Sequence, residues 1–273
     1  DAYKGTRKPM PEELRQQVPV MKEILEAMSI KTMEKPGLEA DDILGTLAKK
    51  AEKNGMDVSL VSGDRDLLQI ASERIKIRIP KTKGGRTEVE DYYAKDVLEK
   101  YQVTPEQFIE LKALMGDTAD NIPGVPKIGE KTATSLLLEY HTIDGIYEHL
   151  DEITKKSIKQ TLSENRNLAD LSKALATIEV QAELDFQFED AKIENLYTKE
   201  AYSYFQELEF KNMLGRFDNE VKESKLALQY EYIETEDGLM DSVDVLYTYE
   251  GSNSTEKPKW KNGIDFPESL SGE

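Results

Sequence analysis

The sequence predicts an α/β fold, with a mostly parallel sheet flanked by helices and a helical subdomain after it. Over residues 1–93, strand patterns rich in branched residues alternate with amphipathic helix patterns, a rhythm that places parallel strands between layers of helices. From about Ala94 to residue 217 the apolar spacing is helical almost throughout. We therefore expect three parts, at 1–93, 94–217 and 218–273. The last part has the composition of an acidic linker or of the start of a further domain.

The first part begins with a helix over residues 11–28, whose first turn contains Pro and Glu. A second helix, over 39–55, is closed by Asn54 and Gly55. Around them the patterns predict strands at 30–34, 56–63, 74–80 and 86–92, and a helical turn at 64–71. Ligands of such sheets lie at the carboxyl ends of strands. The residues that follow the buried strand 56–63 therefore mark a candidate site.

Later segments are read as follows. Helical patterns cover 94–101, 104–116, 129–140, 143–150 and 156–178, a mixed stretch covers 180–188, and a last helix covers 199–210. Beyond Phe217 the signal weakens. Residues 226–234 and 243–250 have strand patterns, and residues 251–263 have the low apolar content of a linker or disordered segment.

Composition fits a soluble globular protein, because 38% of the 273 residues are hydrophobic and 33% are charged. No apolar run approaches the ~20 residues of a membrane span, and the polar start does not resemble a signal peptide. The absence of cysteine excludes disulfides and thiolate metal sites and is compatible with a bacterial cytoplasm. The net charge of −18 argues against a nucleic-acid partner. However, half of that charge lies in residues 218–273, so the body can still carry a local basic face.

Acidic side chains gather in three short groups next to apolar segments. These groups are Glu39, Asp41 and Asp42; Asp64 and Asp66; and Asp117 and Asp120. Spacings of three residues on a helix, or of two at a strand end, let such side chains converge. Carboxylates without cysteine or a catalytic-looking histidine suit hard divalent cations, and Mg²⁺ or Mn²⁺ fits best. Two such ions can activate a water and stabilise the leaving oxygen in phosphodiester hydrolysis.

Each acidic group also has a structural interpretation. Residues 39–42 can simply cap a helix, because acidic residues in a first turn favour the helix dipole. Asp in the "SGDRD" and "GDTADN" stretches is ordinary turn chemistry. The groups become more specific together with the motif at 121–137, "NIPGVPKIGEKTATSLL".

In that motif, Gly124 and Gly129 bracket a tight hairpin between the helix at 105–115 and the helix that starts near Gly129. In such a helix–hairpin–helix, backbone N–H groups can hold a phosphate or a bridging monovalent cation. Lys127 and Lys131 add charge that attracts DNA without regard to sequence. A plain αα-hairpin is the structural alternative.

The order of "YKGTR", "EADD", "SGDRDLLQ" and "LMGDTADNIPGVPKIGEKTA" resembles the 5′-nuclease domain of bacterial DNA polymerase I, in the flap endonuclease superfamily. The resemblance covers about residues 1–217. It implies a PIN/resolvase-like core and two-metal cleavage of 5′ flaps and of nicked or gapped duplexes. It also implies that the helix–hairpin–helix grips DNA and that polymerase domains follow in the parent protein.

By position, the resemblance makes Glu39, Asp41 and Asp42 ligands of the first metal ion. Asp64 and Asp66 resemble ligands shared with the second ion, which Asp117 and Asp120 complete. Lys4 and Arg7 resemble the basic pair at the active-site gateway, where they would contact the scissile phosphate and stabilise developing charge. Taken alone, "YKGTRK" would be a solvated basic turn.

Two aspartate-bearing strands that open the family's pattern have no match here, so we expect an N-terminally truncated core with an underliganded first metal site and weak or no cleavage. The leading hypothesis is a divalent-metal-dependent, structure-specific 5′-nuclease acting in DNA replication and repair. The alternatives are a DNA-binding fragment with weak or no catalysis that retains the helix–hairpin–helix, and an acidic protein-interaction domain. The last explains the charge but not the ordered motifs.

Overall fold

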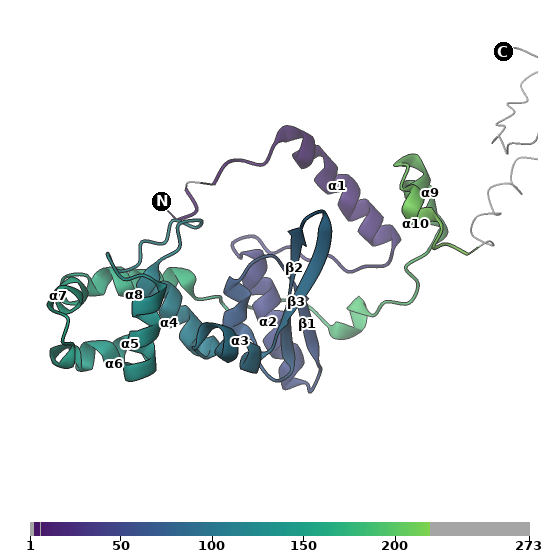
Figure 1. Cartoon of the computed structure of the whole chain (residues 1–273). Coiled ribbons are helices and arrows are strands. Elements are labelled where there is room, and N and C mark those ends of the chain that lie inside the picture. Colours follow the sequence, from purple (N-terminus) through teal and green to yellow (C-terminus); the bar gives the residue numbers. More distant parts are fainter. Residues whose placement is uncertain (1–2, 6, 219–273) are drawn as a thin grey trace, which may run out of the picture. The chain divides into compact units, whose positions relative to one another are not determined.

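The computed structural model describes residues 3–5 and 7–218, and its contacts separate a unit of residues 1–217 from one of residues 218–273. The strand candidates at 226–234 and 243–250 and the linker at 251–263 lie outside the described residues. The first unit is described here by itself (Figure 1). No helix in its described part is long and apolar enough to cross a membrane.

A three-stranded sheet forms the centre of the first part. Its strands are β1 (Val58–Val61), β2 (Ile75–Lys83) and β3 (Arg86–Tyr92), in that spatial order. β1 pairs with β2 in parallel and β2 with β3 antiparallel, so the described sheet is mixed. Ile75, Ile77 and Ile79 alternate along β2 and are almost fully buried, as a strand with one apolar face requires.

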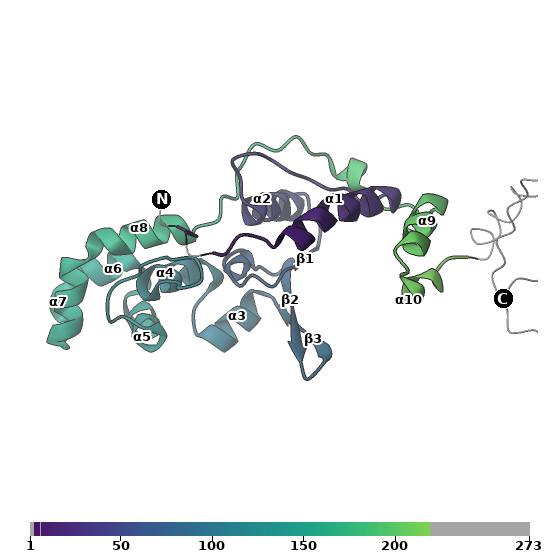
Figure 2. The same cartoon turned by 90° about the horizontal axis from the view of Figure 1, so that it is seen from above.

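Helices and short 3₁₀ turns flank this sheet. They are α2 (Ala40–Lys53), the 3₁₀ turn η1 (Asp66–Ile70) and α3 (Ala94–Tyr101). Helix α1 (Glu12–Ala27) has no buried residue, and its main contact is with α9 (Lys199–Glu207). α2 contacts β1 and η1, whereas α3 contacts β3 (Figure 2). These contacts confirm the α/β class and the helical turn after β1. The predicted strand at 30–34 is wrong, because this mostly exposed segment has no strand partner in the described part of the chain.

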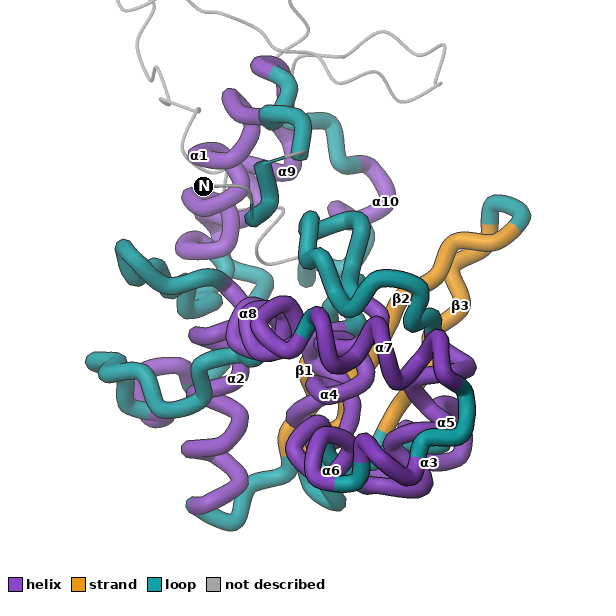
Figure 3. Tube along the Cα trace, turned by 90° about the vertical axis from the view of Figure 1, so that its left-hand side faces the viewer, coloured by secondary structure: helices purple, strands orange, loops and turns teal. Residues whose placement is uncertain are grey.

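The second part is helical, as predicted. Its helices gather around α4 (Pro105–Met115), which contacts both α5 (Glu130–Tyr140) and α8 (Arg166–Ala176) (Figure 3). The remaining elements are α6 (Ile143–Glu148), η2 (Leu150–Glu152), α7 (Lys156–Glu164), η3 (Phe188–Ala191), α9 (Lys199–Glu207) and α10 (Lys211–Leu214).

Two predicted helices are interrupted. The helical stretch at 156–178 breaks between α7 and α8 at Asn165, whose side-chain amide donates a hydrogen bond to the Thr161 carbonyl at 2.7 Å and so closes α7. The last predicted helix, at 199–210, ends at Glu207, and α10 follows after Glu209 adopts a left-handed conformation with φ of 55°.

One apolar core joins the two parts. It extends from the sheet and η1 through α4 to α5 and α8, and its members include Leu68, Ile77, Leu111, Leu137 and Ala169, all less than 2% exposed. Helix α4 therefore belongs to both parts, and the end of α4 is held at a fixed place beside η1.

Residues 176–182, here called the strap, connect α8 back to the first part without joining the sheet. Two side chains of the first part hold the strap's backbone. The Gln69 amide bonds to the Ala176 carbonyl and the Ile178 N–H, each at 2.9 Å. Thr46 bonds to the Glu179 carbonyl at 3.1 Å and accepts the Ala182 N–H at 3.2 Å. These bonds satisfy backbone groups that would otherwise be buried without partners.

Gln69→Leu tests the importance of the strap. We expect the free energy of unfolding to fall by about 2–4 kcal/mol, because the substitution leaves a buried carbonyl and a buried N–H unsatisfied. Urea denaturation monitored by circular dichroism measures this change. The control is Gln160→Leu on exposed α7, which should change stability by no more than ~0.5 kcal/mol. Equal effects of the two substitutions would contradict the role of Gln69.

Candidate active site

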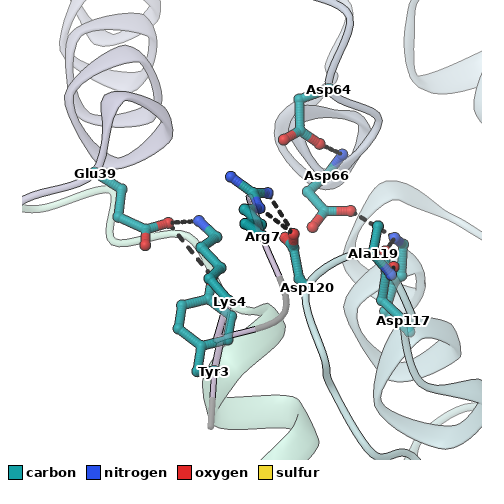
Figure 4. A network of polar contacts seen from close by, with 10 residues as sticks. Tyr3, Lys4, Arg7, Glu39, Asp64, Asp66, Asp117, Ala119 and Asp120 are labelled. Atoms are coloured by element: carbon teal, nitrogen blue, oxygen red, sulfur yellow. Dashed lines mark hydrogen bonds and ion pairs between the residues drawn. The ribbon is translucent and has the colours of Figure 1, made fainter. Parts of the chain in front are cut away.

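Four separate segments meet at a cavity of about 180 Å³. They are the N-terminal residues Tyr3 and Lys4, the start of α2, the turn η1 and the turn after α4 (Figure 4). The carboxylates among its lining residues are Glu39, Asp41, Asp42, Asp66 and Asp120. Residues 174–178, where α8 runs into the strap, form another wall.

The N-terminal segment brings two cations to this cavity. Lys4 forms an ion pair with Glu39, and Arg7 forms one with Asp120, whose Oδ1 lies 3.1 Å from Arg7 Nε. The Lys4 backbone N–H also donates to the Asp120 carbonyl at 2.9 Å. The segment is thus fixed to the turn after α4, which is distant in sequence. The gateway role expected for Lys4 and Arg7 stays a prediction.

Asp42 has a different environment from Glu39 and Asp41. Its Oδ2 accepts the Glu39 N–H at 3.0 Å, and its Oδ1 accepts the Glu179 N–H of the strap at 2.9 Å. The first bond caps α2, as the structural interpretation of this acidic group requires. In this arrangement both Asp42 oxygens are used by backbone donors.

Asp41 is the uncompensated carboxylate of the group. It is half-buried and forms no hydrogen bond or ion pair with any residue in 3–5 or 7–218. Burial, followed by repulsion from Asp64, raises the pKa of Asp41 to about 6. A cation entering the cavity would remove this cost, so the site fits a positively charged ligand.

Asp66 and Asp117 share a buried lysine. Lys112 Nζ lies 2.8 Å from Asp66 Oδ1 and also forms a hydrogen bond to Asp117. Burial raises the pKa of Asp66 despite this contact. Burial also acts to raise the pKa of Asp117, but Lys112 and the Ala119 N–H, 2.8 Å from its Oδ1, hold that pKa below its usual value. Asp64 Oδ1 accepts a hydrogen bond from the Asp66 N–H at 2.9 Å, within the turn that leads into η1.

In the described residues, no three acidic or histidine side chains already stand close enough to hold a metal ion. Their donor chemistry nevertheless fits a hard divalent cation, because carboxylate oxygens line the cavity and Asp41 forms no ion pair with a described residue. For a metal ion to bind, the carboxylates would have to rotate away from their present partners Lys4, Arg7 and Lys112.

The hairpin lies directly beside the Asp117 turn. Asp117 and Ile122 exchange backbone hydrogen bonds of 3.0 and 2.8 Å, which close this turn. Behind it, Gly116 and Gly124 pack backbone against backbone, so that a Cβ on Gly124 would lie 2.4 Å from the Gly116 nitrogen. The buried Ser172 hydroxyl of α8 accepts the Gly124 N–H at 2.9 Å.

These contacts correct one expectation. Gly124 is buried and its N–H is occupied, so it shapes the hairpin and does not present a donor to a phosphate. By contrast, Gly129 is exposed as the N-cap of α5. Lys127 and Lys131 are exposed too and form no ion pair with described residues. This surface of Gly129, Lys127 and Lys131 remains free to meet a ligand.

Two family models match adjoining segments of the chain. The N-terminal resolvase-like domain of 5′–3′ exonucleases matches residues 1–102, and their C-terminal SAM fold matches residues 103–199. The chain belongs to the 5′–3′ exonuclease family. The boundary between the two models falls just before α4.

Curated relatives are DNA polymerases I. Those of Bacillus caldotenax and Bacillus subtilis are 42% and 41% identical over 226 and 223 residues, which are 83% and 82% of this chain. The matches include only 26% and 25% of those proteins, so the chain spans about a quarter of their length.

Solved structures share the fold of this chain. T5 5′-exonuclease with bound zinc has a TM-score of 0.51 and 24% identity, over 81% of this chain and 76% of that one. The catalytic core of Rad2 in complex with DNA has a TM-score of 0.50 and 16% identity, over 72% of this chain and 65% of that one.

Sequence reasoning missed three residues of the site. Lys112, Gln69 and Ser172 are buried polar side chains that bind, respectively, the Asp66–Asp117 pair, the strap and the hairpin. The sequence contains one indication of the role of Lys112, since it is the single charged residue within the apolar run at 111–115. Gln69 and Ser172 give none, because their partners are backbone groups of distant segments.

Asp41→Asn tests the electrostatics of the cavity. Without metal above pH 6, wild-type Asp41 is charged and destabilises the fold. The neutral variant should gain on the order of 1 kcal/mol after solvent screening. The gain should disappear as pH falls from 6 to 4, because Asp41 is then protonated in both states. Thermal melts in EDTA across this range measure the difference.

The control is Asp144→Asn on α6, where the Arg166 ion pair holds the pKa of Asp144 below its usual value. That substitution should lower stability near neutral pH, the opposite sign. A gain for Asp41→Asn that does not vary with pH would contradict the assignment.

Gly124→Ala tests the hairpin geometry. The residue has φ of 62° and would place its Cβ against the Gly116 backbone, so we expect a loss of more than ~3 kcal/mol in stability. Gly129→Ala is the matched control. A Cβ there meets open space at negative φ, so the loss should stay within about 1 kcal/mol. Chemical denaturation compares the two, and similar losses would contradict the close backbone contact.

Proposed function

We propose that this chain is the divalent-metal-dependent 5′-nuclease part of a DNA polymerase I, cleaving 5′ flaps and nicked or gapped duplexes in DNA replication and repair. One observation carries the proposal. In a chain of the 5′–3′ exonuclease family, acidic side chains from α2, η1 and the turn after α4 line one cavity, with Lys4 and Arg7 at its edge. Such a site suits an anionic phosphodiester only if cations accompany it.

Two ions, Mg²⁺ or Mn²⁺, would be held by Glu39, Asp41 and Asp42 on one side and by Asp64, Asp66, Asp117 and Asp120 on the other. When bound, they supply an activated water and a counter-charge for the leaving oxygen. Asp42 is the ligand that must change most, because its oxygens accept two backbone N–H groups.

Lys4 and Arg7 act on the substrate phosphate. Lys4 and Arg7 form ion pairs with Glu39 and Asp120, which are proposed metal ligands. Metal binding would therefore release both cationic groups. Arg7 is half-exposed and Lys4 borders the cavity. A freed guanidinium and ammonium can then contact the scissile phosphate and stabilise charge that develops on it.

The hairpin surface would hold the duplex. Lys127 and Lys131 offer positive charge to the DNA backbone, and the first turn of α5 offers free N–H groups to a phosphate. A monovalent cation bound by the hairpin would add a further positive charge at this phosphate. This contact would not depend on base sequence. The catalytic core of Rad2, which shares this fold, is solved in complex with a DNA substrate, and this supports DNA as the ligand here.

The names of the relatives support a parent protein with polymerase domains. A location in the bacterial cytoplasm is part of the proposal, and the absence of cysteine is compatible with it. The family match and the shared acidic cavity favour a nuclease over a DNA-binding fragment without catalysis. An acidic interaction domain accounts for neither.

Asp117→Asn tests the proposal. We expect wild-type protein to cleave a labelled 5′-flap duplex in Mg²⁺ or Mn²⁺ and not in EDTA. The variant should be slower by about 100-fold, because it loses a ligand charge. DNA affinity in EDTA, measured by fluorescence anisotropy, should change little.

Asp151→Asn is the control, since this exposed carboxylate on η2 pairs only with Lys159 among the described residues, and it should cleave at the wild-type rate. Wild-type protein that binds the duplex but never cleaves it would support the DNA-binding alternative. An unchanged rate for Asp117→Asn would remove Asp117 from the site.

A further inference from the structure

Lys112 is a charged side chain in a position where α4 is otherwise apolar. Its side chain is only 11% exposed, and its neighbours Leu111, Ala113 and Leu114 are buried in the core. A buried ammonium is costly unless its charge is paired and its protons are hydrogen-bonded. Two carboxylates meet that requirement here, Asp66 at 2.8 Å and Asp117 through a hydrogen bond.

The two carboxylates come from different segments. Asp66 opens η1, and Asp117 follows the end of α4. Their negative charges would repel each other if no cation lay between them. Lys112 therefore holds η1 next to the turn that leads into the hairpin.

Asp66 and Asp117 are also carboxylates that the proposed function assigns to a divalent ion. Asp66 Oδ1 is buried and lies in an ion pair with Lys112, but it accepts no hydrogen bond from a described residue. This oxygen can therefore still serve as a ligand. A divalent cation and an ammonium cannot both lie at contact distance from the same oxygens without strong repulsion. Binding one must weaken or displace the other.

We propose that Lys112 is a resident counter-cation that competes with the second metal ion for Asp66 and Asp117. This inference rests on the proposed function, because it concerns the same carboxylates. Without metal, Lys112 holds Asp66 and Asp117 together, and the need to displace Lys112 opposes metal binding at that site. The freed ammonium then lies beside the cavity, where it can meet a substrate phosphate.

Lys112→Met tests the competition in the full chain, because methionine keeps the length of the side chain and its helix preference but removes the charge. Without metal the variant should melt at a lower temperature than wild type. It should bind Mn²⁺ at the site of Asp66 and Asp117 about tenfold more tightly, equal to ~1.4 kcal/mol, and show a larger Mn²⁺-induced rise in melting temperature. Isothermal titration calorimetry and thermal melts measure these effects.

The matched control is Lys173→Met. Lys173 pairs with the mostly buried Glu110 at 2.6 Å, a carboxylate that is not assigned to a metal ion, so Mn²⁺ affinity should not change. Equal or weaker Mn²⁺ binding by Lys112→Met would overturn the competition. Wild-type protein that binds no Mn²⁺ at all would overturn the proposed function instead, which separates the two failures.

A measurement on the wild-type protein covers the case in which Lys112→Met does not fold. Amine acylation followed by mass spectrometry should label Lys112 slowly without metal and several-fold faster in saturating Mn²⁺, because metal entry breaks its ion pairs. Labelling that stays slow in Mn²⁺, while metal binding is confirmed by calorimetry, would also overturn the proposal.

Discussion

Mutual repulsion among the crowded carboxylates is the constraint on which the rest of this structure depends. Acidic side chains from three segments approach one cavity, and each pair of like charges costs free energy unless a cation lies near it. The chain supplies cations of its own: Lys4 for Glu39, Arg7 for Asp120 and Lys112 for Asp66 and Asp117. Asp41 lacks such a partner among the described residues, and its pKa is raised accordingly. The same charges that would hold metal ions thus organise the site without them.

Precise positioning of these charges requires a rigid frame, and α4 supplies most of it. Its apolar side chains belong to the core shared by the sheet and the later helices, so its last turn is fixed beside η1. The strap completes the frame from the other side. Gln69 lies three residues after Asp66 and binds the strap through two buried hydrogen bonds, while Asp42 binds the strap through the Glu179 N–H. The acidic site is therefore held by α4 on one side and by the strap, which follows α8, on the other.

Local patterns were sufficient to predict most of the elements and the acidic groups. β2 alternates cleanly, α4 begins with a Thr104–Gln107 capping box and Pro105, and both features are explicit in the sequence. The errors occurred where tertiary contacts decide. Residues 30–34 have a strand pattern but no partner, and Gly124 looks like a phosphate-binding glycine until Gly116 and Ser172 are placed around it. The roles of Gln69 and Ser172 were beyond prediction, because a single side chain binding distant backbone leaves no periodic signal.

The contact between Gly116 and Gly124 links the acidic cavity to the surface proposed to hold DNA. Gly116 immediately precedes Asp117, and Gly124 begins the hairpin that carries Lys127. Because the two backbones touch and Ser172 anchors Gly124, the hairpin cannot move away from the Asp117 turn without losing buried contacts. A duplex held at Lys127 and Lys131 would therefore be held at a fixed offset from the carboxylates. In a nuclease that reads structure instead of sequence, this offset is what would determine which phosphodiester bond reaches the metal ions, since backbone contacts alone carry no sequence information.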